Sequence, residues 1–166
     1  MKLVLACDHG GLTLKNAVKS YLATRTDSLT DLGTQTPDAV DYPDFATDAA
    51  ERIVEKKADS AILICTTGIG MSMAANRFAG VRAALCFTAE TARKTREHNN
   101  ANILVLAGGS LTPSEGVAIV KAFLDTPFSN ADRHVRRLCK VERENRLSEV
   151  SHLAEADPDV HAAILG

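Results

Sequence analysis

The chain has 166 residues, of which 45% are hydrophobic and 24% charged, and its formal net charge is -2. This length suits a single domain with a substantial core, and the nearly neutral charge argues against a general nucleic-acid-binding protein. No apolar stretch approaches the roughly 18 residues of a membrane-spanning helix. The N-terminal segment 1–7 is typical of a strand rather than a signal peptide. The four cysteines lack metal-binding spacing, which predicts reduced thiols, no metal site and a cytoplasmic protein.

Strands and helices are expected to alternate along the chain. Apolar and β-branched segments predict strands at residues 2–7, 28–32, 61–65, 82–86 and 102–106. Helices are expected at residues 11–23, 44–56, 71–77, 88–97, 113–124 and 129–150. Pro43 can open the second helix, and Thr112, Pro113 and Glu115 form a helix start. This order predicts a parallel sheet of five strands with helices on both faces. We expect one α/β domain over residues 1–150 and a tail of unassigned role over residues 151–166.

A thiol is expected where the third strand meets a helix. Cys65 ends the apolar run 60–65, and the glycine-punctuated turn Thr-Thr-Gly-Ile-Gly follows at 66–70. The carboxyl ends of parallel strands are where open α/β folds bind ligands, and a helix start offers unpaired N–H groups to an anion or a thiolate. One loop would therefore supply a base or nucleophile together with an anion cradle. The alternative is that Cys65 is an inert, buried, small hydrophobic residue.

Further polar clusters fall near predicted strand ends. They are Asp-His-Gly-Gly at 8–11, Asp-Tyr-Pro at 41–43, His-Asn-Asn at 98–100, and the basic residues of the segment 133–140. Each has an ordinary explanation, such as a helix cap or a solvated face. Together they supply an acid, a base and guanidinium groups suited to phosphate.

Six motifs occur in one order from Met1 to about Arg146. They are Cys-Asp-His-Gly-Gly at 7–11, Asp-Tyr-Pro at 41–43, Ile-Cys-Thr-Thr-Gly-Ile-Gly at 64–70, Ala-Ala-Asn-Arg at 74–77, Glu-His-Asn-Asn at 97–100 and Arg-His-Val-Arg-Arg at 133–137. This set resembles the ribose-5-phosphate isomerase B family, which includes galactose-6-phosphate isomerase subunits. The resemblance implies a Rossmann-like three-layer α/β/α sandwich. It also implies a cofactor-free aldose–ketose isomerase that interconverts ribose 5-phosphate and ribulose 5-phosphate through an enediolate, as a homodimer or dimer of dimers with shared sites.

The resemblance also implies a role for each matching residue. Cys65 would move a proton between C2 and C1 of the sugar, and His98, with Asp8, would open the furanose ring. Thr67 would assist the N–H groups that hold the oxyanion, which belong to Thr66, Thr67, Gly68, Ile69 and Gly70. Asn99 and His9 would contact sugar oxygens, and Tyr42 would line the pocket. The phosphate would be bound by Arg133 and Arg137 together with His134.

Two positions depart from the usual pattern of that family. Thr66 follows the cysteine where glycine is usual, and a β-branched residue tolerates a positive φ poorly. Gly109 lies in a stretch that often carries a phosphate-binding arginine. Loss of one charged contact costs about 1.5–3 kcal/mol of binding. Allose 6-phosphate and galactose 6-phosphate are therefore alternative substrates.

Other classes of protein fit the sequence less well. A cysteine phosphatase needs an arginine six residues after the cysteine, where this chain has Met71. A Walker-type nucleotide site needs Gly-Lys-Ser/Thr, which does not follow Gly70. A flavin-binding module is disfavoured by an aromatic content of 4% and no tryptophan. A non-catalytic sugar-phosphate sensor is disfavoured by the joint presence of Cys65 and His98.

Overall fold

The computed structural model describes residues 1–26 and 28–142. Its strands are β1 (Leu3–Cys7), β2 (Leu29–Asp31), β3 (Ser60–Cys65), β4 (Ala83–Leu85) and β5 (Ile103–Ala107). Its helices include the short 3-10 helix η1 (His9–Gly11), α1 (Leu12–Leu22), α2 (Tyr42–Val54), α3 (Ile69–Ala75), α4 (Ala89–Asn99) and α5 (Pro113–Asp125). The predicted alternation of strands and helices is confirmed.

Several predicted boundaries shift by one to three residues. Helix α2 begins at Tyr42 rather than residue 44, because proline fits the first turn of a helix and Pro43 lies within that turn. Helix α4 continues to Asn99, where the left-handed residue Asn100 ends it (φ 45°). The predicted start of α5 is confirmed, since Thr112 and Glu115 form a capping box.

All five strands of the sheet are parallel, in the order β2-β1-β3-β5-β4. The chain moves outward from β1 to β2 and then crosses back over β1 to β3. The strand order therefore reverses between β1 and β3, and such a reversal opens a crevice at the carboxyl ends of the two strands. The loops that follow β1 and β3 meet at this crevice.

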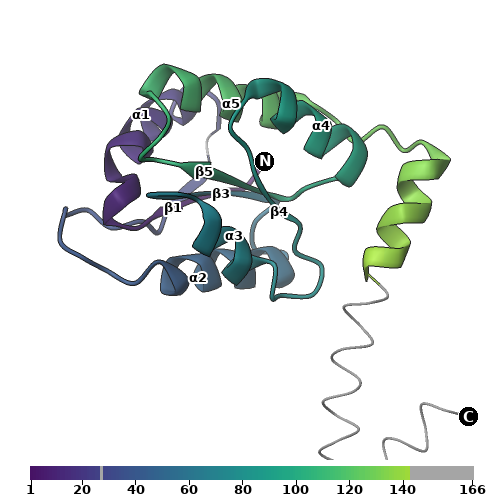
Figure 1. The fold of residues 1–166 in the computed structure, drawn as a ribbon, viewed down its shortest axis with the longest axis horizontal. Coiled ribbons are helices and arrows are strands. Elements are labelled where there is room, and N and C mark those ends of the chain that lie inside the picture. The colour runs from purple at the N-terminus through teal and green to yellow at the C-terminus, as the bar shows by residue number, and fades with distance from the viewer. Residues whose placement is uncertain (27, 143–166) are drawn as a thin grey trace, which may run out of the picture. The chain divides into compact units, whose positions relative to one another are not determined.

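Helices cover both faces of the sheet, as Figure 1 shows, with α1, α4 and α5 on one side and α2 and α3 on the other. Alternate residues of β1 serve the two faces. Leu3 and Leu5 pack with α1, α4 and α5, whereas Val4 and Ala6 pack with α2 and α3. Because both faces are buried, the central strands consist of nearly continuous apolar runs. The predicted Rossmann-like three-layer sandwich is confirmed.

The chain divides into two compact units, Met1–Ser129 and Asn130–Gly166. In the second unit, residues 132–142 are helical, within the helix predicted at residues 129–150. The remainder of that prediction, the boundary at residue 150 and the tail at 151–166 lie outside the described residues. None of the helices over the described part of the chain is long and apolar enough to cross a membrane.

Candidate active site

The loops after β1 and β3 form the centre of the candidate site. Asp8, the first residue after β1, donates its backbone N–H to the carbonyl of Ile64 in β3 at 3.2 Å. Its side chain is 5% exposed and caps η1 by accepting the N–H of Gly11 at 3.1 Å. The carboxylate is thereby fixed at the carboxyl end of the sheet, beside the strand that ends at Cys65.

Cys65 is the last residue of β3 and is 4% exposed. Its Sγ accepts the backbone N–H of Gly68 at 3.1 Å. Gly68 adopts the left-handed conformation (φ 75°, ψ -18°) that turns the chain into α3. Residues other than glycine adopt this backbone conformation only at a cost in free energy. The Gly68 N–H therefore fixes the sulfur at the carboxyl end of β3, where the loop leads into α3.

Thr66 and Thr67 continue this loop and are exposed. Among the described residues Thr66 is not one of those with positive φ, so the threonine needs no strained backbone where the family usually has glycine. A methyl carbon added at Gly10 would overlap Thr66 Oγ1, so the absence of a side chain at Gly10 makes room for the threonine. Thr67 Oγ1 accepts the N–H of Ile69 at 3.3 Å. Two of the N–H groups expected to hold an oxyanion thus have local acceptors in this structure.

His9 and Tyr42 lie at the same edge of the sheet. Exposed His9 accepts the backbone N–H of Val40 on Nδ1 at 3.3 Å, so a neutral imidazole carries its proton on Nε2. Tyr42, at the first turn of α2, lies against Gly70, where an added methyl carbon would be 2.5 Å from Tyr42 Cζ. The contacts from Val40 and Tyr42 tie the segment before α2 to both loops. The sequence carried no signal for the Val40 contact because its donor is a backbone group.

His98 and Asn99 lie at the opposite edge of the sheet from Cys65. They form the last turn of α4, and the carbonyl of the next residue, Asn100, accepts Arg82 Nε at 2.9 Å, just before β4 begins. At this edge β3 begins and Ala61 pairs with Ile103. Ala61 and Cys65 are four residues apart on β3, which is about 13 Å at roughly 3.3 Å per residue. One copy of the chain therefore does not bring His98 and Cys65 together.

Arg133, His134 and Arg137 belong to the second unit. They lie on the helical segment 132–142, where Arg133 and Arg137 are exposed and one helical turn apart. Arg133 Nε donates to His134 Nε2 at 3.2 Å. The two guanidinium groups share one helix face, as a pair that binds one phosphate requires.

The sandwich, with a thiol-bearing loop at its strand-order reversal, has clear relatives. Residues 3–141 match the family model described as Ribose/Galactose Isomerase. The chain therefore belongs to the ribose/galactose isomerase family.

Individual members of this family are similar over most of the chain. Ribose-5-phosphate isomerase B of Mycolicibacterium paratuberculosis is 40% identical over 90% of this chain and 97% of its own. The crystal structure of a ribose 5-phosphate isomerase from Thermotoga maritima has a TM-score of 0.82 at 46% identity, covering 86% of this chain and 97% of its own. Ribose-5-phosphate isomerase B of Mycoplasma genitalium, solved with bound ribulose-5-phosphate, has a TM-score of 0.83 at 42% identity, covering 87% and 96%.

Proposed function

We propose that this protein interconverts D-ribose 5-phosphate and D-ribulose 5-phosphate. The observation that carries the proposal is the Cys65 thiol, held by the N–H of Gly68 beside Asp8 at the strand-order reversal. Membership of the ribose/galactose isomerase family, and a relative solved with ribulose-5-phosphate, support the same reaction.

In the proposed reaction, the Cys65 thiolate removes the proton from C2 of the open-chain aldose. The electron pair of that C–H bond forms the C1–C2 double bond, and the carbonyl π electrons move to O1. After a proton passes from O2 to O1, the Cys65 thiol protonates C1, the carbonyl forms at C2 and the thiolate is regenerated. A general base of this kind typically contributes about 10²–10⁴-fold in rate. The step needs no metal or coenzyme.

The remaining residues are assigned to binding and ring opening. His98, assisted by Asp8, opens the furanose ring, and the loop N–H groups other than those of Gly68 and Ile69 stabilise charge on O1 together with Thr67. His9 and Asn99 contact sugar hydroxyls, Tyr42 lines the pocket, and the phosphate is bound by Arg133 and Arg137 with His134. The phosphate-binding residues hold a part of the substrate that does not react, and so orient C1 and C2 at the sulfur.

We further propose that the active site is shared between two copies of the chain. The position of His98 at the sheet edge opposite Cys65 supports this arrangement, because a second copy can bring its own His98 to the first copy's Cys65. Twofold dimers are the commonest assembly and would form two such sites. The four free cysteines accord with a reducing compartment, and we propose that the dimer works in the cytoplasm.

The substrate is tested by comparing kcat/KM for ribose 5-phosphate, allose 6-phosphate and galactose 6-phosphate, with and without a chelator. We expect ribose 5-phosphate to be preferred and the chelator to have no effect. A preference for either hexose phosphate would replace the substrate proposed here. Activity lost to the chelator and restored by a divalent ion would refute the metal-free reaction.

The shared site is tested by mixing two inactive variants, Cys65→Ala and His98→Ala, after reversible dissociation. Random pairing makes half the dimers hybrid, and each hybrid has one intact site of two, so about a quarter of the activity should return. Cys65→Ala mixed with Asp8→Asn is the matched control, since these two residues lie at the same edge of one chain and no intact site forms. No recovery with His98→Ala, once subunit exchange is verified, would show that each site is built by one chain.

A further inference from the structure

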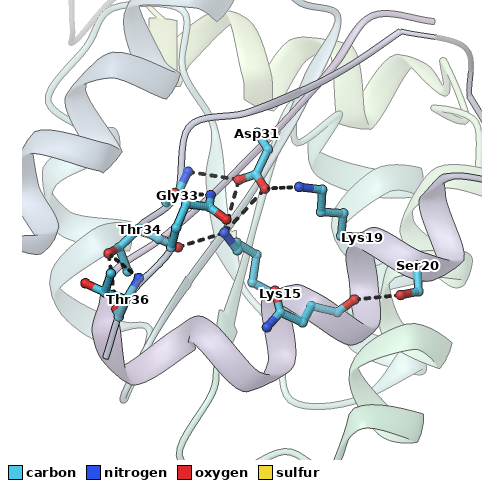
Figure 2. A network of polar contacts seen from close by, with 9 residues as sticks. Lys15, Lys19, Ser20, Asp31, Gly33, Thr34 and Thr36 are labelled. Atoms are coloured by element: carbon cyan, nitrogen blue, oxygen red, sulfur yellow. Dashed lines mark hydrogen bonds and ion pairs between the residues drawn. The ribbon is translucent and has the colours of Figure 1, made fainter. Parts of the chain in front are cut away.

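Lys15 is a buried lysine on α1 that the mechanism above does not use. Its side chain is 0% exposed, yet its ammonium group is fully engaged. Nζ donates to the carbonyl of Thr34 at 2.7 Å and forms an ion pair with Asp31, whose Oδ1 and Oδ2 lie at 3.4 and 3.3 Å (Figure 2). Lys15 therefore joins α1 to the end of β2 and to the segment that follows it.

Asp31 does not depend on Lys15 alone for its hydrogen bonds. Asp31 also accepts Lys19 Nζ at 2.7 Å and the N–H of Gly33 at 3.0 Å, so it keeps two partners if Lys15 is lost. Loss of one partner of a buried ion pair is destabilising when the other charge is left unpaired, and Lys19 keeps the Asp31 carboxylate paired. The contact specific to Lys15 is its bond to the Thr34 carbonyl, which fixes the start of the segment 34–41.

The far end of the segment 34–41 lies in the candidate active site. The N–H of Val40 donates to His9 Nδ1 at 3.3 Å, and Tyr42 follows directly against Gly70. At the near end, the N–H of Thr34 donates to the carbonyl of Cys7, the residue before Asp8. The segment thus connects the Lys15 ammonium group to the His9 ring through the backbone.

We propose that Lys15 is a positioning residue for His9. By holding the Thr34 carbonyl it fixes the segment 34–41, so that the N–H of Val40 stays on His9 Nδ1. His9 is thereby kept in the tautomer whose Nε2–H can donate to a hydroxyl or carbonyl oxygen of the sugar phosphate. The role in substrate binding rests on the proposed isomerase function, whereas the effect on the His9 tautomer does not.

The test is a double-mutant cycle between Lys15→Met and His9→Ala, followed by kcat and KM for ribose 5-phosphate. Methionine fills the volume of the lysine stem and leaves Asp31 paired with Lys19. We expect Lys15→Met to raise KM about tenfold, because small displacements of positioned groups can cost up to about 10²-fold. We expect kcat to change far less. In the His9→Ala background, Lys15→Met should have no further effect, since the group it positions is gone.

Lys19→Met is the matched control, because Lys19 binds the same carboxylate from the surface and does not reach Thr34. Lys19→Met should leave KM within about twofold of the value for the unaltered protein. A KM increase from Lys15→Met that is equal with His9 and with Ala at position 9 would overturn the proposal. So would a KM increase of the same size from Lys19→Met.

Long-range ¹H–¹⁵N spectra of histidine provide a readout independent of activity, with the His9 signals assigned by their loss in His9→Ala. We expect the Nε2–H tautomer in the unaltered protein and in Lys19→Met, and a mixture of tautomers in Lys15→Met. An unchanged His9 signal in Lys15→Met would refute the positioning role. Absence of isomerase activity in the unaltered protein would refute the proposed function alone.

If Lys15→Met does not fold, Lys15→Gln replaces it in the same cycle, since glutamine keeps a polar side chain beside Asp31 but lacks the ammonium group that holds the Thr34 carbonyl. We expect a KM increase of about threefold that vanishes in the His9→Ala background. An equal increase in both backgrounds would overturn the proposal.

Discussion

The close approach of Gly10 and Thr66 predicts that each residue restricts the other. A methyl carbon added at Gly10 would overlap Thr66 Oγ1 and lie 3.1 Å from both Cβ and N of Thr66. Rotation of the threonine moves the hydroxyl but leaves the 3.1 Å contacts. Such overpacking costs about 1–3 kcal/mol. At about 2–4 °C per kcal/mol for a chain of this size, Gly10→Ala should lower Tm by roughly 2–12 °C.

Thermal unfolding of single and double variants measures this effect. Thr66→Gly removes both side-chain atoms that face Gly10, so Gly10→Ala should cost much less Tm when Thr66 is also replaced. Gly80→Ala is the control, because Gly80 has a positive φ of 80° and no atom within 4 Å of an added methyl carbon. The loss of Tm in Gly80→Ala comes from backbone strain and should be the same with threonine or glycine at position 66. A Gly10→Ala loss that Thr66→Gly does not reduce would refute the steric argument.

Cys7, Cys86 and Asp31 have pKa values shifted from their usual ranges. Burial raises the pKa of the Cys7 thiol to about 11 and also raises that of Cys86, so iodoacetamide at pH 8 should label exposed Cys139 and leave those two unmodified until the protein unfolds. Mass spectrometry would disprove this if Cys7 were labelled in the native protein. Burial of Asp31 is outweighed by hydrogen bonds from Lys19 and Gly33 and by the charge of Lys15, so its pKa is lowered. The Asp31 carboxylate therefore stabilises the folded protein fully at pH values above the pKa of an ordinary carboxyl group. This contribution disappears as the pH falls through the pKa of Asp31 in the folded protein. Asp31→Asn should lower the denaturant midpoint of unfolding at pH 6, whereas in strong acid the variant and the unaltered protein should have the same midpoint. A difference in midpoint that does not change with pH would contradict this prediction.

The sequence was sufficient to predict the elements and the loop at Cys65, because their signals are local. Apolar runs identify β1, β3 and β5, and Thr112 with Glu115 marks the start of α5. The order of the strands depends on which helices pack on which face, which no local pattern encodes. The sequence therefore could not show that β1 and β3 are adjacent and that the loops after them are neighbours.

Lys15 shows a different limit of sequence reasoning. It precedes Val18 by three residues and Leu22 by seven, a spacing that places all three on the buried stripe of α1. A lysine within an apolar stripe is most often assigned to the surface, since lysine is rarely buried without a partner. Its partners, Asp31 and the Thr34 carbonyl, come from another element, and only the fold brings them to it.

Replacement of the Cys65 sulfur shows whether this thiol transfers the proton in the proposed ribose-5-phosphate isomerase reaction. Cys65→Ala should keep the Tm and KM of the unaltered protein, while kcat falls by about 10²–10⁴-fold. Cys139→Ala, which removes an exposed thiol, should retain full activity. If Cys65→Ala keeps more than about a tenth of the original kcat for ribose 5-phosphate, Cys65 is not the base.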